Sequence, residues 1–320
     1  MNQKGEVTTT QIVGLVLLLF GFAIIILFLV SYPWKSGIDK EACHEQIVMR
    51  SSVNLKGLNV GTKSIIPLDK CGTEKICLSM SGGDCEEFGP ATSEDRITKI
   101  SVKNENDVMI VFANSLYDCN SLLGKGQLDF LPKGFSEKKY CLSCARIAFD
   151  KEAKEKLKDI NYYDLYKLMY SMKDTDGNRF LEVVYPGFSS YEYSLDLYKK
   201  YQEERKTQGK TVELKDWVIN IKQPGGFILL SSMDKTGTAL QWLAGGAAAG
   251  TTFVALSAIA IMTGVGAPIG FGMLAVSGVA GGAAFYYTTP NTDYYYFAPF
   301  IVPYDLKSLS DIKCTNFQWA

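Results

Sequence analysis

The chain has 320 residues, with 33 basic and 34 acidic side chains and a formal net charge of −1. This balance excludes a nucleic-acid binder of the simple electrostatic kind, because such proteins carry a large basic surplus that displaces phosphate counterions. Two long stretches, 7–34 and 236–292, contain no charged residue, whereas the rest of the chain is rich in charge. A composition divided in this way predicts a membrane protein with a folded, water-exposed domain.

The first uncharged stretch predicts a transmembrane anchor. Residues 12–30, "IVGLVLLLFGFAIIILFLV", match a hydrocarbon core of about 30 Å when they are helical. Residues 1–11 then form a short cytoplasmic N-terminus. Tyr32 and Trp34 suit the membrane interface, and Pro33 stops the helix. Because the apolar run is longer than a signal-peptide core and no small-residue cleavage site follows it, we expect a retained signal anchor.

The segment "KGEVTTTQIVGLVLLL" resembles the class III, type IV pilin-like leaders of archaea. In that family a peptidase cuts after a basic–glycine pair and leaves the apolar helix attached, and Lys4 and Gly5 match this pair. The resemblance implies cleavage after Gly5. The chain departs from the pattern at Thr10, where a mature pilin carries a carboxylate, and at Pro33, which interrupts a helix that pilins continue. The rest of the chain resembles no family.

The second uncharged stretch is rich in glycine and alanine and is long enough to cross a membrane twice. The segment "GVGAPIG" lies near its middle, and Pro268 is its strongest turn signal. We therefore expect a transmembrane helical hairpin over 239–287, with helices at 239–263 and 268–287 and a turn at 264–268. Its few polar residues disfavour a water-filled channel, and it lacks the spacing of a phosphate-binding loop.

Small residues recur at four-residue spacing in this expected hairpin, which lets helix backbones approach closely. The glycines expected in helix packing are Gly246, Gly250, Gly266, Gly270, Gly278 and Gly282. The aromatic residues expected at the membrane interface are Trp242, Tyr286 and Tyr287. Such packing is compatible with an oligomeric bundle, or with a hairpin that enters a second membrane.

The chain contains eight cysteines, all outside the uncharged stretches. They are Cys43, Cys71, Cys77, Cys85, Cys119, Cys141, Cys144 and Cys314. If the glycine-rich stretch crosses the membrane twice, the domain and the C-terminal tail share one compartment and all eight can pair. The even count favours structural disulfides in an oxidising, extracytoplasmic compartment, and the spacing leaves their connectivity open.

Two chemical alternatives involve these cysteines. A metal site needs paired Cys-x-x-Cys elements or several histidines, but "CLSC" is the one such pair and His44 is the one histidine. A redox-active Cys141–Cys144 pair stays open, although such motifs sit at a helix N-terminus and this sequence alternates like a strand. No triad of serine or cysteine with histidine is indicated. We expect no catalytic site, no metal and no cofactor.

Residues 35–235 suffice for one domain, which the sequence predicts to be a disulfide-braced α+β fold. Strands are predicted in "ITKISVKNENDVMIVFANS" as a hairpin, and in "KKYCLSCARIAFD", "RFLEVVYPG" and "ELKDWVINIKQPGGFILLSS". Helices are predicted in "DKEAKEKLKDINYYDLYKLMYSMKD", with Asp150 as N-cap, and in "SLDLYKKYQEERKTQGK". "KDTDGNRFLE" matches an EF-hand calcium loop poorly, because Val183 stands where the terminal carboxylate belongs, and we expect a helix-to-strand turn.

Residues 288–320 are expected to form an extracytoplasmic tail that docks on the domain. "NTDYYYFAPFIVPYDLKSLSDIKC" is rich in aromatic and β-branched residues and predicts a strand that needs a partner. Docking would place Cys314 near the other seven cysteines, so that it can be locked to one of them.

These features together predict a non-enzymatic, membrane-anchored cell-envelope protein with a structural or interaction role. It would be a multi-pass protein with an extracytoplasmic main domain. Its expected partners are membrane lipid, a second copy of the chain or other envelope proteins, and not nucleic acid. Two alternatives stay open, namely a membrane-remodelling protein that acts through the glycine-rich hairpin and a membrane-bound thiol oxidoreductase that uses Cys141 and Cys144.

Overall fold

The computed structural model describes residues 14, 17–24, 35–52, 71–89, 97–122, 124–126, 128, 140–185, 190–192, 195, 199, 218–222, 226–234, 270–275, 283–288, 294–303 and 316–318. Within them, one nine-stranded mixed sheet organises the domain. Its strand order is β2 (Ile97–Ser101), β1 (Glu74–Ser79), β3 (Tyr140–Phe149), β6 (Gly226–Asp234), β9 (Tyr294–Phe297), β8 (Ala283–Thr288) and β7 (Gly270–Ala275). Two further strands lie off this path, with β10 (Phe300–Pro303) paired to β6 and β11 (Asn316–Gln318) paired to β3.

The sheet has a parallel part and an antiparallel part. β1 pairs in parallel with both β2 and β3, and β11 also runs parallel to β3. From β3 through β6, β9 and β8 to β7 the pairing is antiparallel. The helices are α2 (Lys35–Ser52), α3 (Glu105–Leu122), α4 (Lys151–Lys156), α5 (Tyr162–Ser171) and α6 (Phe180–Val184). Two 3-10 turns, η2 (Glu86–Phe88) and η3 (Gly124–Gly126), and a small pair of strands, β4 (Ile160–Asn161) and β5 (Val218–Ile219), complete the described elements.

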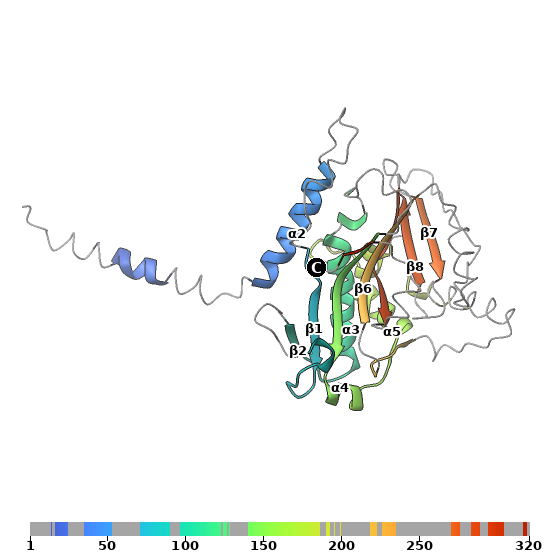
Figure 1. Ribbon diagram of the computed structural model, residues 1–320, viewed down its shortest axis with the longest axis horizontal. Coiled ribbons are helices and arrows are strands. Elements are labelled where there is room, and N and C mark those ends of the chain that lie inside the picture. The colour runs from blue at the N-terminus through green and yellow to red at the C-terminus, as the bar shows by residue number, and fades with distance from the viewer. Residues whose placement is uncertain are drawn as a thin grey trace, which may run out of the picture.

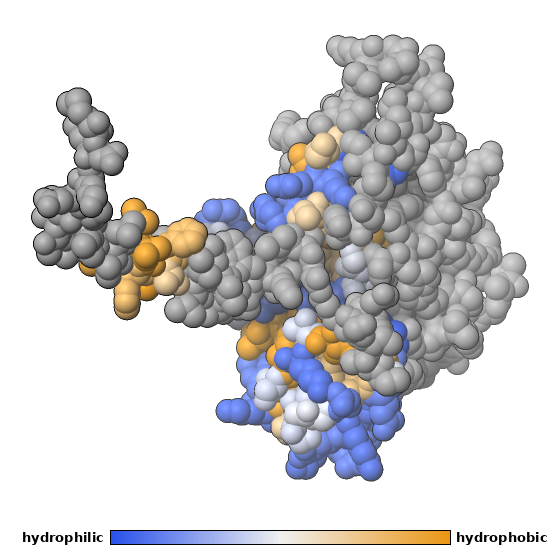
Figure 2. Space-filling model, turned by 60° about the vertical axis from the view of Figure 1, so that its left-hand side comes forward, coloured by the Kyte–Doolittle hydropathy of each residue, from blue (hydrophilic) through white to orange (hydrophobic). Residues whose placement is uncertain are grey.

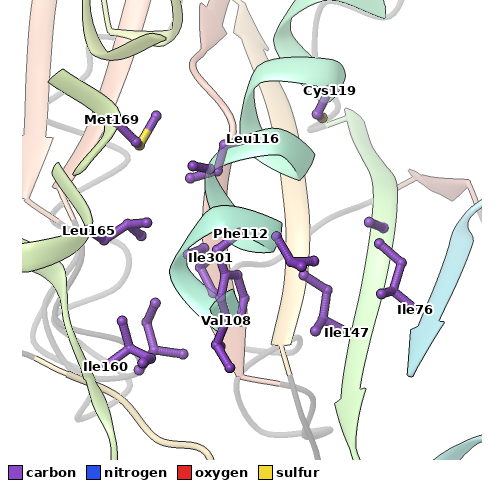
Figure 3. Close-up of a cluster of buried hydrophobic side chains, with 14 of the residues drawn as sticks. Ile76, Val108, Phe112, Leu116, Cys119, Ile147, Ile160, Leu165, Met169 and Ile301 are labelled. Atoms are coloured by element: carbon purple, nitrogen blue, oxygen red, sulfur yellow. The ribbon is translucent and has the colours of Figure 1, made fainter. Parts of the chain in front are cut away.

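The main core lies between one face of the sheet and the helices α3, α5 and α6 (Figure 1). Phe112 of α3 has no exposed surface and points toward Ile147 of β3 (Figure 3). Leu165 and Met169 of α5, both fully buried, face α3 from the other side (Figure 3). Burial of side chains of this size contributes about 1.5–3 kcal/mol each, so this cluster is the main source of stability in the domain.

A smaller cluster covers the opposite face of the sheet. It contains Cys77 of β1, Cys85 and Phe88 at η2, and Ala148 of β3, with Ile97 packed against it. Successive residues of a strand point to opposite faces. Around Cys77 and Ala148, β1 and β3 are therefore buried on both faces, as strands of parallel sheets generally are.

The tail strands lie in the same sheet as the domain. β10 and β9 share one edge of β6, whose other edge pairs with β3. Between them, Ala298 is fully buried, and the Tyr185 hydroxyl donates a 3.0 Å hydrogen bond to the carbonyl oxygen of Pro299. The sequence indicated a strand in need of a partner at this point, and β6 is that partner.

Several elements agree with the sequence. β3, β5 and β6 form where the sequence predicted strands. Asp150 caps α4, because its side chain accepts a hydrogen bond from the backbone N–H of Ala153. A domain of mixed helices and strands is therefore confirmed. Leu195 and Lys199 are helical, and the rest of the helix predicted in "SLDLYKKYQEERKTQGK" lies outside the described residues.

The hairpin predicted in "ITKISVKNENDVMIVFANS" is wrong in its second half. Only β2 is a strand, and the remainder forms α3. The side chain of Asn104 accepts a hydrogen bond from the N–H of Asp107, and Asp107 accepts one from the N–H of Lys103, so the Asn-Glu-Asn segment begins a helix. The buried residues of α3 recur at the three- and four-residue spacing of a helix, and they are Val108, Val111, Phe112, Ala113, Ser115, Leu116, Cys119 and Asn120.

Two other predictions on the domain need correction. "RFLEVVYPG" contains a helix, α6, rather than a strand, and its buried residues are Phe180, Leu181 and Val184. The single long helix predicted after Asp150 is divided into α4 and α5. Leu157 ends α4 in an extended conformation, β4 follows, and the side chain of Asn161 caps α5. An internal cap of this kind begins a new helix within one apolar pattern.

The helix predicted over 268–287 is also wrong, because this segment contains β7 and β8. The two strands pair in antiparallel register, with Gly272 opposite Tyr286, and β8 joins them to β9. Glycine is a poor helix former, whereas aromatic and β-branched residues favour strands. The other predicted helix, 239–263, and the turn at 264–268 lie outside the described residues.

The predicted anchor at 12–30 is described in part. Residues 17–24 are helical, and their large apolar side chains are 57–69% exposed, from Leu19 at the low end to Leu18 and Phe20 at the high end. Figure 2 shows this segment as an apolar surface at one side of the molecule. Among the described residues, no helix has both the length and the apolar character needed to cross a membrane.

Candidate functional site

Three disulfides lie in and around the parallel part of the sheet. Cys43 of α2 bonds to Cys71, three residues before β1. Cys77 of β1 bonds to Cys85, and Cys119 of α3 bonds to Cys144 of β3. The expectation of structural disulfides is thus confirmed for six of the eight cysteines.

Two cysteines, Cys141 and Cys314, are not part of these three bonds. Cys141 belongs to β3, and its Cα is the partner of Phe317 in the parallel ladder with β11. Cys314 precedes β11 by two positions and lies outside the described residues. Cys144 is bonded to Cys119, so Cys141 and Cys144 do not form a disulfide with each other. Both lie within a strand rather than at a helix N-terminus, where thiolates are stabilised.

A second feature lies where the parallel strands β1 and β3 end. Asp150 follows β3 directly and is 2% exposed. Its Oδ2 accepts hydrogen bonds from the Ser79 hydroxyl at 2.6 Å and from the N–H of Met80 at 3.2 Å. The N–H and the hydroxyl of Ser81 donate to the same oxygen, at 3.4 and 3.3 Å, while the Ala153 N–H donates to Oδ1 at 2.7 Å. The carboxylate therefore holds the two strand ends together.

These hydrogen bonds determine the charge state of Asp150. Burial by itself raises the pKa of a carboxyl group, because it disfavours the charged form. The hydrogen bonds from Ser79, Ala153, Ser81 and Met80 favour the charged form and outweigh burial, so the pKa of Asp150 lies below its ordinary value. Asp150 is accordingly an ionised structural group whose oxygens already have donors. It is poorly suited to act as a general base, which needs a raised pKa.

The loop after β1 is shaped to fit Asp150. Gly82 has a φ of 83°, in the region that favours glycine, and its N–H donates to the Ser79 hydroxyl at 2.6 Å. A Cβ on Gly83 would lie 3.3 Å from Asp150 Oδ2. The Cys77–Cys85 disulfide closes the base of this loop. Ser81, Gly82 and Asp84 are left exposed as a small polar rim.

A third group of contacts fixes α2 against the domain. Lys40 Nζ lies 3.0 Å from Glu74 Oε2 of β1 and 2.8 Å from Asp118 Oδ2 of α3. Burial lowers the pKa of Lys40, but the two carboxylates outweigh it and raise the pKa above its ordinary value. His44 Nδ1 lies 2.8 Å from the carbonyl oxygen of Leu122, the last residue of α3.

A charged cluster lies beside η2 on the sheet face opposite the main core. Lys154 of α4 pairs with Glu87 Oε1, and Arg146 of β3 donates a 2.5 Å hydrogen bond to the Glu87 carbonyl oxygen. The Arg146 guanidinium also lies over the ring of Phe88, 4.9 Å from its centroid. These contacts fasten η2 to β3 and α4.

The "KDTDGN" segment forms a closed turn. Asp174 Oδ1 accepts hydrogen bonds from the N–H groups of Asp176 and Asn178, at 3.0 and 2.8 Å, and the Tyr117 hydroxyl donates to Oδ2. Gly177 has a φ of 84°. The turn joins α5 to α6 rather than to the strand that was predicted. Within the described ranges, no group of histidine, cysteine, aspartate and glutamate is placed to bind a metal ion.

The residues predicted for membrane packing fall into two groups. Gly270 begins β7, and Tyr286 and Tyr287 belong to β8, so all three have positions in the sheet. The others lie outside the described residues: Tyr32, Trp34, Trp242, Gly246, Gly250, Gly266, Gly278 and Gly282.

Sequence reasoning identified Asp150 as a helix cap but missed its link to Ser79 and Ser81. The available signal was "CLSMSGGD", a strand followed by small polar residues and two glycines.

Comparisons with known protein families, with curated proteins and with solved structures find no match for this chain. Its function is therefore inferred from its own residues.

Proposed function

We propose that this protein is a membrane-anchored cell-envelope protein with a non-enzymatic, structural or interaction role. Its domain would lie in an extracytoplasmic compartment, and its partners would be membrane lipid and a second copy or another envelope protein. The observation that carries the proposal is the set of three disulfides, Cys43–Cys71, Cys77–Cys85 and Cys119–Cys144. Disulfides persist in oxidising compartments and are rare where thiols are kept reduced.

The anchor is supported by residues 17–24. Leu17, Leu18, Phe20 and Phe22 are each at least 60% exposed in the described part of the chain. Leaving apolar area in water is unfavourable by about 25 cal/mol per Å². A lipid environment removes this cost for the whole uncharged N-terminal stretch, and it explains why the stretch carries no charge on any side.

A structural role is supported by the way the polar groups are used. The Asp150 and Asp174 carboxylates accept hydrogen bonds from groups of the chain itself. The Lys40 ammonium lies between Glu74 and Asp118. Each of these charges holds elements of the fold together, which is what a rigid binding or assembly module requires.

The two alternative functions, a thiol oxidoreductase and a membrane-remodelling protein, are not supported by comparable observations. The oxidoreductase needs Cys141 and Cys144 as a redox pair, but Cys144 is bonded to Cys119. The remodelling protein needs an independent helical hairpin, but β7 and β8 are strands of the domain sheet. The single N-terminal anchor therefore remains the proposed membrane attachment.

The anchor is tested by introducing charge into it. We expect the double variant Leu18→Lys/Phe20→Lys to leave the membrane fraction during an alkaline wash that the unchanged chain resists. The matched control is Val48→Lys/Met49→Lys on α2, where both side chains are exposed and apolar but lie outside the anchor. Retention of the Leu18/Phe20 variant, or equal loss of both variants, would contradict the proposal.

The compartment is tested by labelling in intact cells. Lys167 is an exposed residue of α5, and Lys167→Cys adds one accessible thiol to the domain. We expect a membrane-impermeant maleimide to label this variant, above the background of the parent chain, before the cells are opened. Labelling that appears only after detergent treatment would place the domain in the cytoplasm.

A further inference from the structure

We propose that the Cys43–Cys71 disulfide carries mechanical tension from the N-terminal anchor directly into β1, so that the backbone between the two cysteines carries none. The inference rests on the proposed membrane attachment, because it assumes that the pull on the domain arrives from the N-terminal side. It assigns this bond a role in force transmission that the other two disulfides do not share.

The position of the bond supports this role. Cys43 lies near the middle of α2, the first described helix after the anchor, and Cys71 lies just before β1. The two are separated by 28 positions. A pull that reaches Cys43 has two routes to β1, the short covalent bond and the much longer intervening backbone. The bond becomes taut first, and the longer route stays slack.

Without the bond, α2 would be held by non-covalent contacts alone, among them those of Lys40 and His44. Cys43 and Ile47 are its buried core residues, whereas Glu41, Glu45, Val48 and Met49 are exposed. The partners of Lys40 are a surface carboxylate, Asp118, and the partly exposed Glu74. Surface ion pairs of this kind contribute about 0–1 kcal/mol each. Such contacts orient α2, but they would yield one after another if the helix were pulled away.

The strand that receives the tension is well placed to bear it. β1 pairs along its length with β2 on one side and with β3 on the other. A pull along β1 therefore acts on two ladders of hydrogen bonds together, which resist more than a helix peeling off residue by residue.

The test is single-molecule pulling of the full chain in detergent, with handles at the two ends. We expect the oxidised wild-type chain to show no low-force extension from the α2 region beyond Cys43. The double variant Cys43→Ser/Cys71→Ser is expected to gain an early, low-force event. Its added length is about 95 Å, from 28 positions at about 3.4 Å per extended residue.

The matched control is Cys77→Ser/Cys85→Ser, which removes a disulfide outside the proposed route. Its 8 positions release about 27 Å, and we expect this release during the main unfolding event rather than before it. If the Cys43/Cys71 variant unfolds at the same force as the wild type and without an early event, the non-covalent contacts carry the tension and the inference is wrong.

A second measurement does not depend on how the cysteine variant folds. A specific protease site inserted between residues 53 and 70 allows the backbone to be cut while the disulfide stays intact. If the bond carries the tension, the cut and uncut chains will give the same rupture force. Separation of the cut chain at low force would overturn the inference.

These outcomes are independent of where the protein resides. Pulling in detergent reports on the bond, whereas the wash and labelling experiments report on the membrane and the compartment. A chain that fails those two tests but passes the pulling tests would have a mechanical link at α2 without a membrane anchor.

Discussion

Asp150 and Ser79 lie 71 positions apart in the chain, and the Ser79 hydroxyl donates a 2.6 Å hydrogen bond to the Asp150 carboxylate. Through this contact the ends of two neighbouring parallel strands, β1 and β3, are joined by a single buried charge. The same carboxylate also begins α4. One side chain therefore fixes a loop, a strand end and a helix start.

Removing this carboxylate should destabilise the domain. We expect Asp150→Ala to lower the free energy of unfolding by about 3 kcal/mol, because buried donors lose their acceptor and α4 loses its cap. Urea denaturation measures the change. Glu155→Ala, at an exposed position of α4, is the matched control and should change the stability by about 0.5 kcal/mol or less. Equal effects of the two substitutions would refute the role given to Asp150.

The charge of Asp150 also predicts a pH dependence. Its pKa in the folded protein lies below the ordinary value, so the folded state favours the ionised form. The stabilisation is fully present above the pKa of the unfolded chain, about 3.9, and is lost as the pH falls through the folded pKa. We expect the stability difference between wild type and Asp150→Asn to shrink below about pH 4. A difference that stays constant from pH 7 to pH 2 would show that ionisation contributes nothing.

A peptide map without reduction should contain four linked pairs. Three are Cys43–Cys71, Cys77–Cys85 and Cys119–Cys144. We expect the fourth to join Cys141 and Cys314, because β11 begins two positions after Cys314 and lies beside Cys141 in the ladder with β3. Mass spectrometry after alkylation of free thiols decides the point. Recovery of Cys141 and Cys314 in alkylated form would contradict this pairing.

The strand assignment of the glycine-rich stretch is open to a cross-linking test. Gly272 and Tyr286 are directly opposite each other in β7 and β8, so a disulfide should form in the variant Gly272→Cys/Tyr286→Cys. In one helix over 268–287 the same two positions would lie about 20 Å apart, too far for a disulfide. Gly272→Cys/Ala283→Cys is the control, since Ala283 is opposite Ala275. Cross-linking of the control pair with equal yield would undermine the ladder.

Local patterns in the sequence were sufficient to predict some helices and strands correctly, but not others. The segment that forms β3 has the alternating pattern of a strand, and Asp150 precedes a run of helix formers, so both elements were predictable. The sequence predicts a strand in α3 because the segment 108–112, directly after its polar first turn, is a short apolar run rich in β-branched residues. The helical spacing becomes clear only over the longer window to Cys119.

The contacts between elements that are distant in the sequence could not be predicted from local patterns. The bond between Asp150 and Ser79, and the pairing of Cys43 with Cys71, join residues that no window of sequence places together. The Asp150–Ser79 contact forms because β1 and β3 are neighbours in the sheet, although β2 and α3 lie between them in the chain. Which strands become neighbours, and which cysteines pair, depends on the topology of the fold, and the spacing of residues in the sequence does not determine it.

The arrangement around β6 has a consequence for synthesis. β6 ends at Asp234. The strands that pair with its second edge, β9 (Tyr294–Phe297) and β10 (Phe300–Pro303), are synthesised only after the whole glycine-rich stretch. A nascent chain that has just released β6 therefore exposes a strand edge with no partner. Such edges attract other chains. A chaperone that shields extended apolar segments would protect the chain during that interval, and its absence should appear as aggregation during synthesis rather than as instability of the finished domain.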